Sequence, residues 1–213
     1  MDYIVKGLSD VIQFFFELTG SYGWAIIILT VIIRLLLAPL QHLQVKQAAK
    51  TRELEPLRKQ IEKRFRGDPK RIQEETLRLY RAQKVNPMAG CLPLLVQLPI
   101  LIAFFSALNN MHYSGVPAFW WIADLSKPDP IILPVLVGIT TFVQSKQTTG
   151  PSQDDATSQM LLYLMPLLVA WMSTRFAAGL GLYWVVSNLV AILQQLVFPA
   201  GRTGKPKPKE AAS

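Results

Sequence analysis

Acidic residues are absent from the long apolar runs of this 213-residue chain. Its 14 Asp and Glu residues all lie outside five such runs, residues 23–40, 88–111, 131–144, 160–174 and 180–198. One permanently charged residue, Arg34, does lie inside a run. A buried arginine with a structural role normally has a carboxylate partner. The absence therefore excludes an internal ion pair for Arg34 within these runs.

Cysteine and histidine are also scarce. Cys91 is the only cysteine, which excludes a disulfide within the chain. The two histidines, His42 and His112, fall at opposite faces of the expected membrane, so no nucleophile, base and orienting group converge. No phosphate-binding loop or metal-ligand cluster is visible. The sequence predicts no enzyme, no catalytic residue, no metal site and no cofactor.

The abundant residues are hydrophobic, at 51% of the chain against 17% charged, and they lie in long blocks. This pattern predicts an all-α polytopic membrane protein with the five runs as transmembrane helices. Residues 131–144 would reach only about 21 Å, against roughly 30 Å of hydrocarbon. Such short runs are either re-entrant segments or spans in a locally thinned bilayer, and we favour spans.

Positive charge predicts the orientation of these spans. Of the 22 Lys and Arg residues, thirteen fall in residues 41–85, four follow Pro199, and Lys146 lies between the third and fourth runs. Positively charged short loops stay on the cytoplasmic side. The pattern therefore predicts an N-terminus outside the cell and a cytoplasmic C-terminus.

Three segments outside the runs have recognisable patterns. The pattern of residues 1–22 predicts an amphipathic helix. Its net charge of minus two favours a position at the external surface of the membrane that the chain spans. Residues 41–85 predict a cytoplasmic helical hairpin turning at Gly67-Asp68-Pro69, and residues 199–213 a basic cytoplasmic tail. The positive charge of the hairpin either only enforces topology, or it also contacts lipid or the RNA of a translating ribosome.

Polar side chains inside the runs predict an internal site. Thr30 and Arg34 lie four residues apart and share one helical face. Further polar residues in the runs are Gln97, Gln144, Ser187 and Asn188. We expect Arg34 to face a cavity, where water or a visiting anionic group pairs with it. The alternative is an arginine that extends about 9 Å to the cytoplasmic surface.

Four stretches carry a resemblance to a known family: IIRLLLAPL, KVNPMAGCLPLLVQLPI, FWWIADLSKPDPIILPVL and GLGLYWVVSNLVAILQQ. Together they resemble the YidC/Oxa/Alb membrane protein insertases, in the form of a minimal bacterial YidC core without the large outer domain and extra first span. The resemblance implies five spans around a hydrophilic groove, open to the cytoplasm and the lipid and sealed outside. It assigns Arg34 as the groove arginine and matches Thr30, Gln144, Tyr183 and Trp184 to groove or substrate-contacting positions.

The resemblance also implies a function. A nascent membrane segment would enter the groove and leave sideways into the lipid of the bacterial inner membrane, without chemistry. The expected partners are nascent membrane proteins, membrane lipid and a translating ribosome bound by hairpin and tail; the participation of a Sec translocon is left open. The alternative function is a channel or anion transporter that uses Arg34.

Overall fold

The computed structural model describes residues 2–85, 92–111, 113, 115–149 and 159–197. Within these residues all regular structure is helical, and the one β pairing is an isolated bridge between Phe119 and Ile122. The predicted helical fold class is therefore confirmed. Cys91 and the predicted tail 199–213 lie outside the described residues.

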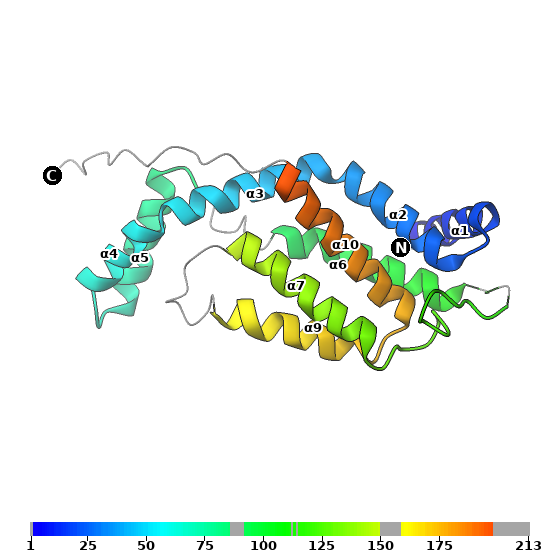
Figure 1. The fold of residues 1–213 in the computed structure, drawn as a ribbon. Helices are drawn as coiled ribbons and strands as arrows, with labels where there is room; N and C mark the ends of the chain where they lie inside the picture. Colours follow the sequence, from blue (N-terminus) through cyan, green and yellow to red (C-terminus); the bar gives the residue numbers. More distant parts are fainter. Residues whose placement is uncertain (1, 86–91, 112, 114, 150–158, 198–213) are drawn as a thin grey trace.

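Nine helices and one π-helical turn are described, seen in Figure 1. In chain order they are α1 (Asp2–Thr19), α2 (Tyr22–Leu36), α3 (Ala38–Glu53), α4 (Glu55–Arg64), α5 (Pro69–Ala82), α6 (Leu92–Asn110), α7 (Ile132–Thr149), the π-helical turn η2 (Met160–Leu164), α9 (Met165–Ser173) and α10 (Ala178–Val197).

The helices form a body with an extension at one end. In the body, α10 packs against α2, α6, α7 and α9, and α1 packs against α2 and α6. From α2, the long α3 leads to the hairpin of α4 and α5, which lies at the opposite end of the molecule from α1 (Figure 1). The polar site described below lies where α2, α6, α7 and α10 meet.

The first apolar run does not form one uninterrupted helix. We predicted a helix over residues 23–40, but α2 ends at Leu36 and α3 begins at Ala38, with a bend of 59° between α2 and the helical arm that follows. Pro39 supplies the physical reason. It has no N–H for the carbonyl four residues earlier, and its ring crowds that carbonyl. Arg34 is thus placed in the last turn of a helix.

The third run shows a second difference in length. The predicted helix over residues 131–144 is described as α7, which continues to Thr149 and has 18 residues. Such a helix is about 27 Å long. The added turn is polar, with Ser145, Lys146 and Gln147, so the apolar part remains as short as predicted.

The hairpin turn follows from local sequence rules. Asp68 accepts a hydrogen bond from the Arg71 N–H at 3.1 Å and so caps the start of α5, while Pro69 occupies its first turn. Gly67 has a φ of +99°, which a residue without a side chain adopts at no steric cost. These three residues turn the chain where the sequence predicted it.

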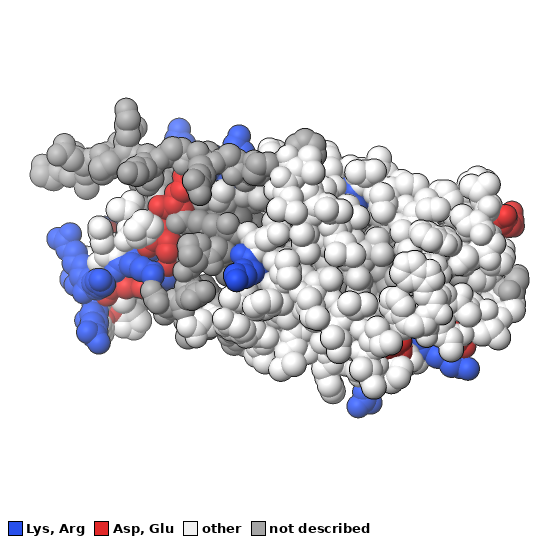
Figure 2. Space-filling model, viewed as in Figure 1, with Lys and Arg blue, Asp and Glu red and all other residues white. Residues whose placement is uncertain are grey.

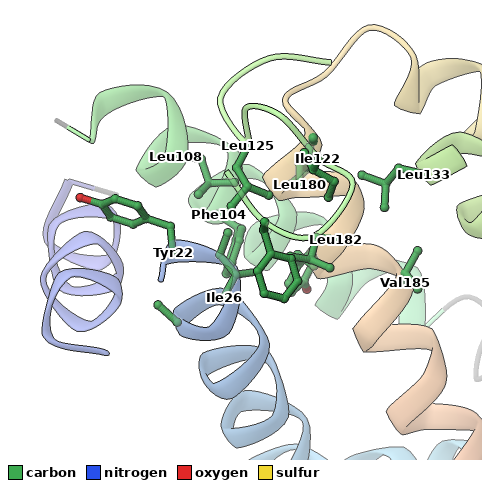
Figure 3. Packing of buried hydrophobic residues seen from close by; sticks show 14 of the residues in the cluster. Tyr22, Ile26, Phe104, Leu108, Ile122, Leu125, Leu133, Leu180, Leu182 and Val185 are labelled. Carbon is green, nitrogen blue, oxygen red and sulfur yellow. The ribbon is translucent and has the colours of Figure 1, made fainter. Parts of the chain in front are cut away.

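The core of the body is a single apolar cluster contributed by α1, α2, α6, α7, α10 and the loop before α7 (Figure 3). Phe104 and Tyr183 stack at its centre, with ring centroids 4.4 Å apart. Gly181 lets α10 approach α7 closely, because a Cβ there would come within 2.6 Å of a Leu133 methyl carbon. Burial of this kind stabilises the fold by about 25 cal/mol per Å² of apolar surface.

The outside of the body is apolar as well. Exposed large hydrophobic side chains lie on α6, α7, α9 and α10, including Ile102, Ile139, Trp171 and Leu193. On the face shown in Figure 2, charged side chains gather at the two ends and are few between them. So many exposed hydrophobic side chains on neighbouring helices suit contact with lipid.

By length and composition, one described helix, α10, is suited to cross a membrane alone. The bent pair of α2 with the following arm passes the same criterion when taken together, and a shorter apolar helix covers Leu162–Ser173. The count of five spans therefore stays a prediction.

Candidate functional site

Arg34 lies inside the body, between α2, α6 and α10. Its relative exposure is 8%, and Thr30, one turn earlier on α2, is fully buried. The Thr30 hydroxyl donates to the Ile26 carbonyl of its own helix at 2.6 Å. Thr30 thus lies on the face that the sequence predicted, but its hydroxyl is already bonded within α2.

The guanidinium of Arg34 is bound by neutral side chains. Its Nε donates to the Ser187 hydroxyl at 2.5 Å, and its Nη2 donates to the Gln97 Oε1 at 3.5 Å. Gln97 in turn donates through Nε2 to the Tyr183 hydroxyl at 2.8 Å. Among the described side chains, none of the ion pairs includes Arg34. The positive charge is therefore hydrogen-bonded but not neutralised.

The environment of Arg34 adds to the sequence prediction. The water or visiting anion that we predicted beside Arg34 stays a prediction, and the structure adds that hydroxyl and amide oxygens contact the guanidinium, which has little exposure. The guanidinium does not extend to the surface. Three helices meet at Arg34. The acceptors for its guanidinium are Gln97 on α6 and Ser187 on α10, so the sequence of its own helix does not reveal them.

A second polar cluster joins α10 to α7. Asn188 donates to the hydroxyls of Thr140 at 3.1 Å and Thr141 at 3.0 Å, and the Trp184 indole N–H donates to Thr141 at 3.0 Å. Gln144 lies one turn beyond Thr140 on α7 and is half-buried. Sequence reasoning missed the two threonines, although two adjacent hydroxyls in an apolar run are a usable signal.

The structure therefore divides the predicted site residues between two contacts. Arg34, Gln97, Tyr183 and Ser187 form one hydrogen-bonded group between α2, α6 and α10. Trp184 and Asn188 belong to the contact with α7. The two groups are adjacent along α10.

The loop before α7 lies at the end of the body away from the hairpin and is bonded to α10. The Lys127 and Leu125 carbonyls accept hydrogen bonds from the Ala178 and Gly179 N–H groups, at 2.8 and 2.9 Å. These donors belong to the first turn of α10, which has no partners within its own helix. Leu125 is fully buried. The loop is thus anchored to α10 by backbone bonds and apolar packing.

Two titratable groups, Tyr113 and Asp124, lie between α6 and α7. Burial raises the pKa of Tyr113 to about 12, and its hydroxyl donates to the Leu108 carbonyl at 3.1 Å. Hydrogen bonds from Ser126 hold the pKa of the Asp124 carboxyl below its usual value. Neither group changes charge near neutral pH, so the charge of this region does not depend on pH there.

A small apolar cavity lies beside the polar site. Its volume is about 80 Å³, and it lies between α6, α7, α9 and α10. Leu101, Val137 and Met172 line it together with Trp184, the residue that also bonds Thr141. The space accepts an apolar side chain and offers few hydrogen-bonding partners.

A helical body with an apolar exterior and a buried, unneutralised arginine defines a membrane protein with an internal polar site. Residues 14–204 match the family model described as 60Kd inner membrane protein. The chain belongs to this family, and the resemblance to the YidC/Oxa/Alb insertases is confirmed.

The relatives carry a common name. Membrane protein insertase YidC of Cupriavidus taiwanensis is 41% identical over 178 residues, covering 83% of this chain and 32% of that protein. The protein of the same name from Endomicrobium trichonymphae is 39% identical over 204 residues, covering 91% of this chain and 39% of that protein. The chain thus spans about a third of the length of these relatives.

A solved structure agrees with the fold. It is the crystal structure of an active YidC insertase with its first transmembrane domain resolved, and the alignment has a TM-score of 0.66 at 30% identity. The alignment covers 93% of this chain and 46% of that one. The similarity therefore extends over nearly all of the chain.

Proposed function

We propose that the chain is a membrane protein insertase and chaperone. It takes nascent membrane segments into a hydrophilic groove open to the cytoplasm and releases them sideways into the bilayer. The names of its relatives support this activity. Insertion makes and breaks no covalent bond, so it needs no catalytic residue and no cofactor.

One observation carries the mechanism: Arg34 is buried and bound only by neutral oxygens among the described side chains. A hydrogen bond that involves a charged group contributes about 1.5–3 kcal/mol, and pairs of opposite charge are the stronger ones. A carboxylate in the flank of a client therefore displaces Ser187 and Gln97 favourably. The exchange replaces part of the hydration that the flank loses on entering the membrane.

The remaining site residues have distinct parts in this proposal. Gln97, Tyr183 and Ser187 hold Arg34 until a client arrives. Thr30, Gln144 and Asn188 add polar groups to the groove wall, and Trp184 borders the apolar cavity, which suits a hydrophobic client side chain. Apolar burial in lipid then drives release.

The topology and partners are part of the same proposal. Five spans place the N-terminus outside and the hairpin and tail in the cytoplasm of a bacterium, with the chain in the inner membrane. Thirteen basic residues in residues 41–85 suit contact with ribosomal RNA or anionic lipid.

A channel or anion transporter is the alternative, and the loop before α7 argues against it. A channel needs a continuous path, whereas this loop is bonded through Leu125 and Lys127 to the first turn of α10. The closure favours a site reached from one side and from the lipid.

The test uses purified protein in liposomes with a single-span client that has an acidic tail. Arg34→Ala is expected to lower insertion roughly tenfold or more, because one charge-assisted contact is lost. Protease protection of the client tail measures insertion. The matched control is Arg175→Ala, which removes an exposed arginine near the closed end and is expected to leave insertion unchanged.

Insertion by Arg34→Ala at the normal rate would overturn the proposal. An anion flux through liposomes that contain the protein alone, abolished by the same substitution, would support the channel instead.

A further inference from the structure

The backbone carbonyl of Arg34 lies at a helix end. The last four carbonyls of a helix have no partner within it, and α2 ends at Leu36. The Ile33 carbonyl accepts from the Leu37 N–H at 3.0 Å. The Leu35 carbonyl lacks the usual donor four residues later, because Pro39 has no N–H. The break that Pro39 introduces thus falls within one turn of the charged residue of the site.

A side chain from α10 reaches this carbonyl. Gln194 Nε2 donates to the Arg34 oxygen at 3.2 Å. Ser187, which binds the Arg34 guanidinium, lies seven residues earlier, two turns away on the same face of α10. One face of α10 therefore holds both the backbone and the side chain of a single residue.

The amide of Gln194 makes only part of its possible contacts. Its Oε1 is buried and has no hydrogen-bond partner among the described residues. An unpaired buried carbonyl destabilises a fold, and an apolar side chain would avoid that loss. The contact that favours glutamine at this position is its N–H donation to Arg34.

We propose that Gln194 is a positioning residue for Arg34. By bonding the last turn of α2, it fixes the direction in which the guanidinium leaves the helix, and it fixes the point where the arm α3 turns away. This inference rests on the proposed function of Arg34. It assigns Gln194 an effect on clients that Arg34 recognises and none on clients that it does not.

The neighbouring residue offers a matched control. Gln195 has the same side chain and is also half-buried, but it lies about 100° around the helix and is not bonded to Arg34. Gln194→Met and Gln195→Met each replace an amide by an unbranched apolar chain of similar size. Two clients that differ only in an acidic or a neutral tail complete the experiment.

The expected result is selective. In liposomes, Gln194→Met lowers insertion of the acidic-tailed client about tenfold, the size of one lost charge-assisted contact, and changes the neutral-tailed client less than about twofold. Gln195→Met changes neither. Adding Gln194→Met to Arg34→Ala gives no further loss, because the positioned group is gone.

Other outcomes overturn the proposal. Equal losses for both clients, or a lowered melting temperature in detergent, would assign Gln194 to structure alone, and so would a failure of the variant to fold. Gln194→Glu is a second variant. It keeps the shape of the side chain, but its ionised carboxylate cannot donate a hydrogen bond to the Arg34 carbonyl. Full insertion of the acidic-tailed client by this variant would also overturn the proposal. Arg34→Ala distinguishes failure of this inference from failure of the proposed function. If Arg34→Ala blocks insertion of the acidic-tailed client and Gln194→Met does not, only this inference fails. If Arg34→Ala has no effect, the proposed function fails.

Discussion

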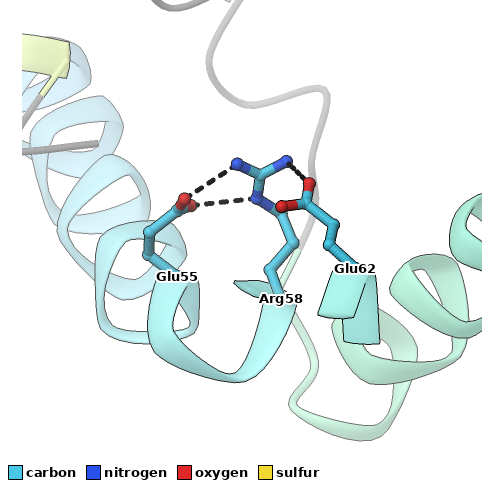
Figure 4. Close-up of polar contacts among 3 residues, drawn as sticks. All are labelled: Glu55, Arg58 and Glu62. Atoms are coloured by element: carbon cyan, nitrogen blue, oxygen red, sulfur yellow. Dashed lines mark hydrogen bonds and ion pairs between the residues drawn. The ribbon is translucent and has the colours of Figure 1, made fainter. Parts of the chain in front are cut away.

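Arg34 in the body and Arg58 in the hairpin are two arginines with opposite kinds of partner. Arg58 donates to both oxygens of Glu55, at 2.8 and 3.1 Å, and to Glu62 at 2.7 Å (Figure 4). Its side chain is only 16% exposed, so it too is mostly covered. Arg34 is also mostly covered, but its hydrogen-bond acceptors among the described side chains are the neutral oxygens of Ser187 and Gln97.

The difference shows how to distinguish an arginine whose charge is already neutralised from one that can still pair with a carboxylate. The charge of Arg58 is neutralised within its own helix, at spacings of three and four residues. Nothing remains for a partner to neutralise. The charge of Arg34 keeps that capacity, because neutral acceptors bind a guanidinium without cancelling its charge.

The largest expected effect comes from giving Arg34 the kind of partner that Arg58 has. Gln97→Glu changes the volume very little and places a carboxylate beside the guanidinium. The internal pair then competes with the client, and we expect insertion of an acidic-tailed client to fall roughly tenfold or more. The measurement is protease protection in liposomes.

Gln195→Glu serves as the control for this substitution, since it adds the same charge near the C-terminal end of α10 without a contact to Arg34. We expect a smaller loss from it. An unchanged rate in Gln97→Glu would show that the charge of Arg34 is not what clients use.

A smaller effect is expected from the reverse change, the removal of the hairpin arginine. Arg58→Ala breaks two pairs near the protein surface, and such pairs typically contribute about 0.2–1 kcal/mol each. We expect slightly faster hydrogen exchange in α4 and unchanged insertion. The difference between variant and parent should shrink in 1 M salt, where charges are screened beyond about 3 Å. A tenfold loss of insertion would place a functional charge in the hairpin and end the contrast.

The smallest effect concerns the backbone at the end of the hairpin. Lys84 has a φ of +54°, and the Val85 N–H donates back to the Tyr80 carbonyl at 2.9 Å, a helix ending that favours glycine. Lys84→Gly should stabilise α5 by about 0.5–1 kcal/mol. Slower amide exchange in α5 measures it. Gln83→Gly, at a φ of −89°, should have the opposite sign.

Local rules predicted much of the hairpin. The turn at Gly67-Asp68-Pro69 follows from a positive φ, a capping carboxylate and a proline that suits a first helical turn. Each of these preferences acts within a few residues, so it is readable from the sequence. The Pro39 break was harder to predict, because the run stays apolar to Leu40 and hydropathy alone continues across the bend.

Sequence reasoning named the residues of the polar group around Arg34 but not their hydrogen bonds. Arg34, Gln97 and Ser187 were named as polar residues inside apolar runs, Tyr183 was named through the family resemblance, and the structure brings the four together. Which acceptor each N–H donor reaches depends on how α6 and α10 are rotated about their axes, and the sequence does not give that rotation. For the same reason Gln194 could not be told from Gln195, and Thr140 and Thr141 were not named as site residues.

The contact between Arg34 and Ser187 joins residues 153 positions apart. At about 5–20 residues per second, a ribosome needs roughly 8–30 seconds to make the second residue after the first. During that interval the newborn chain contains an arginine whose eventual neighbours do not yet exist. The insertion of this chain into a membrane therefore requires an unpaired charge to enter lipid, as it does for any membrane segment with a polar flank. Under the proposed function, a copy of the protein already in the membrane would assist that insertion.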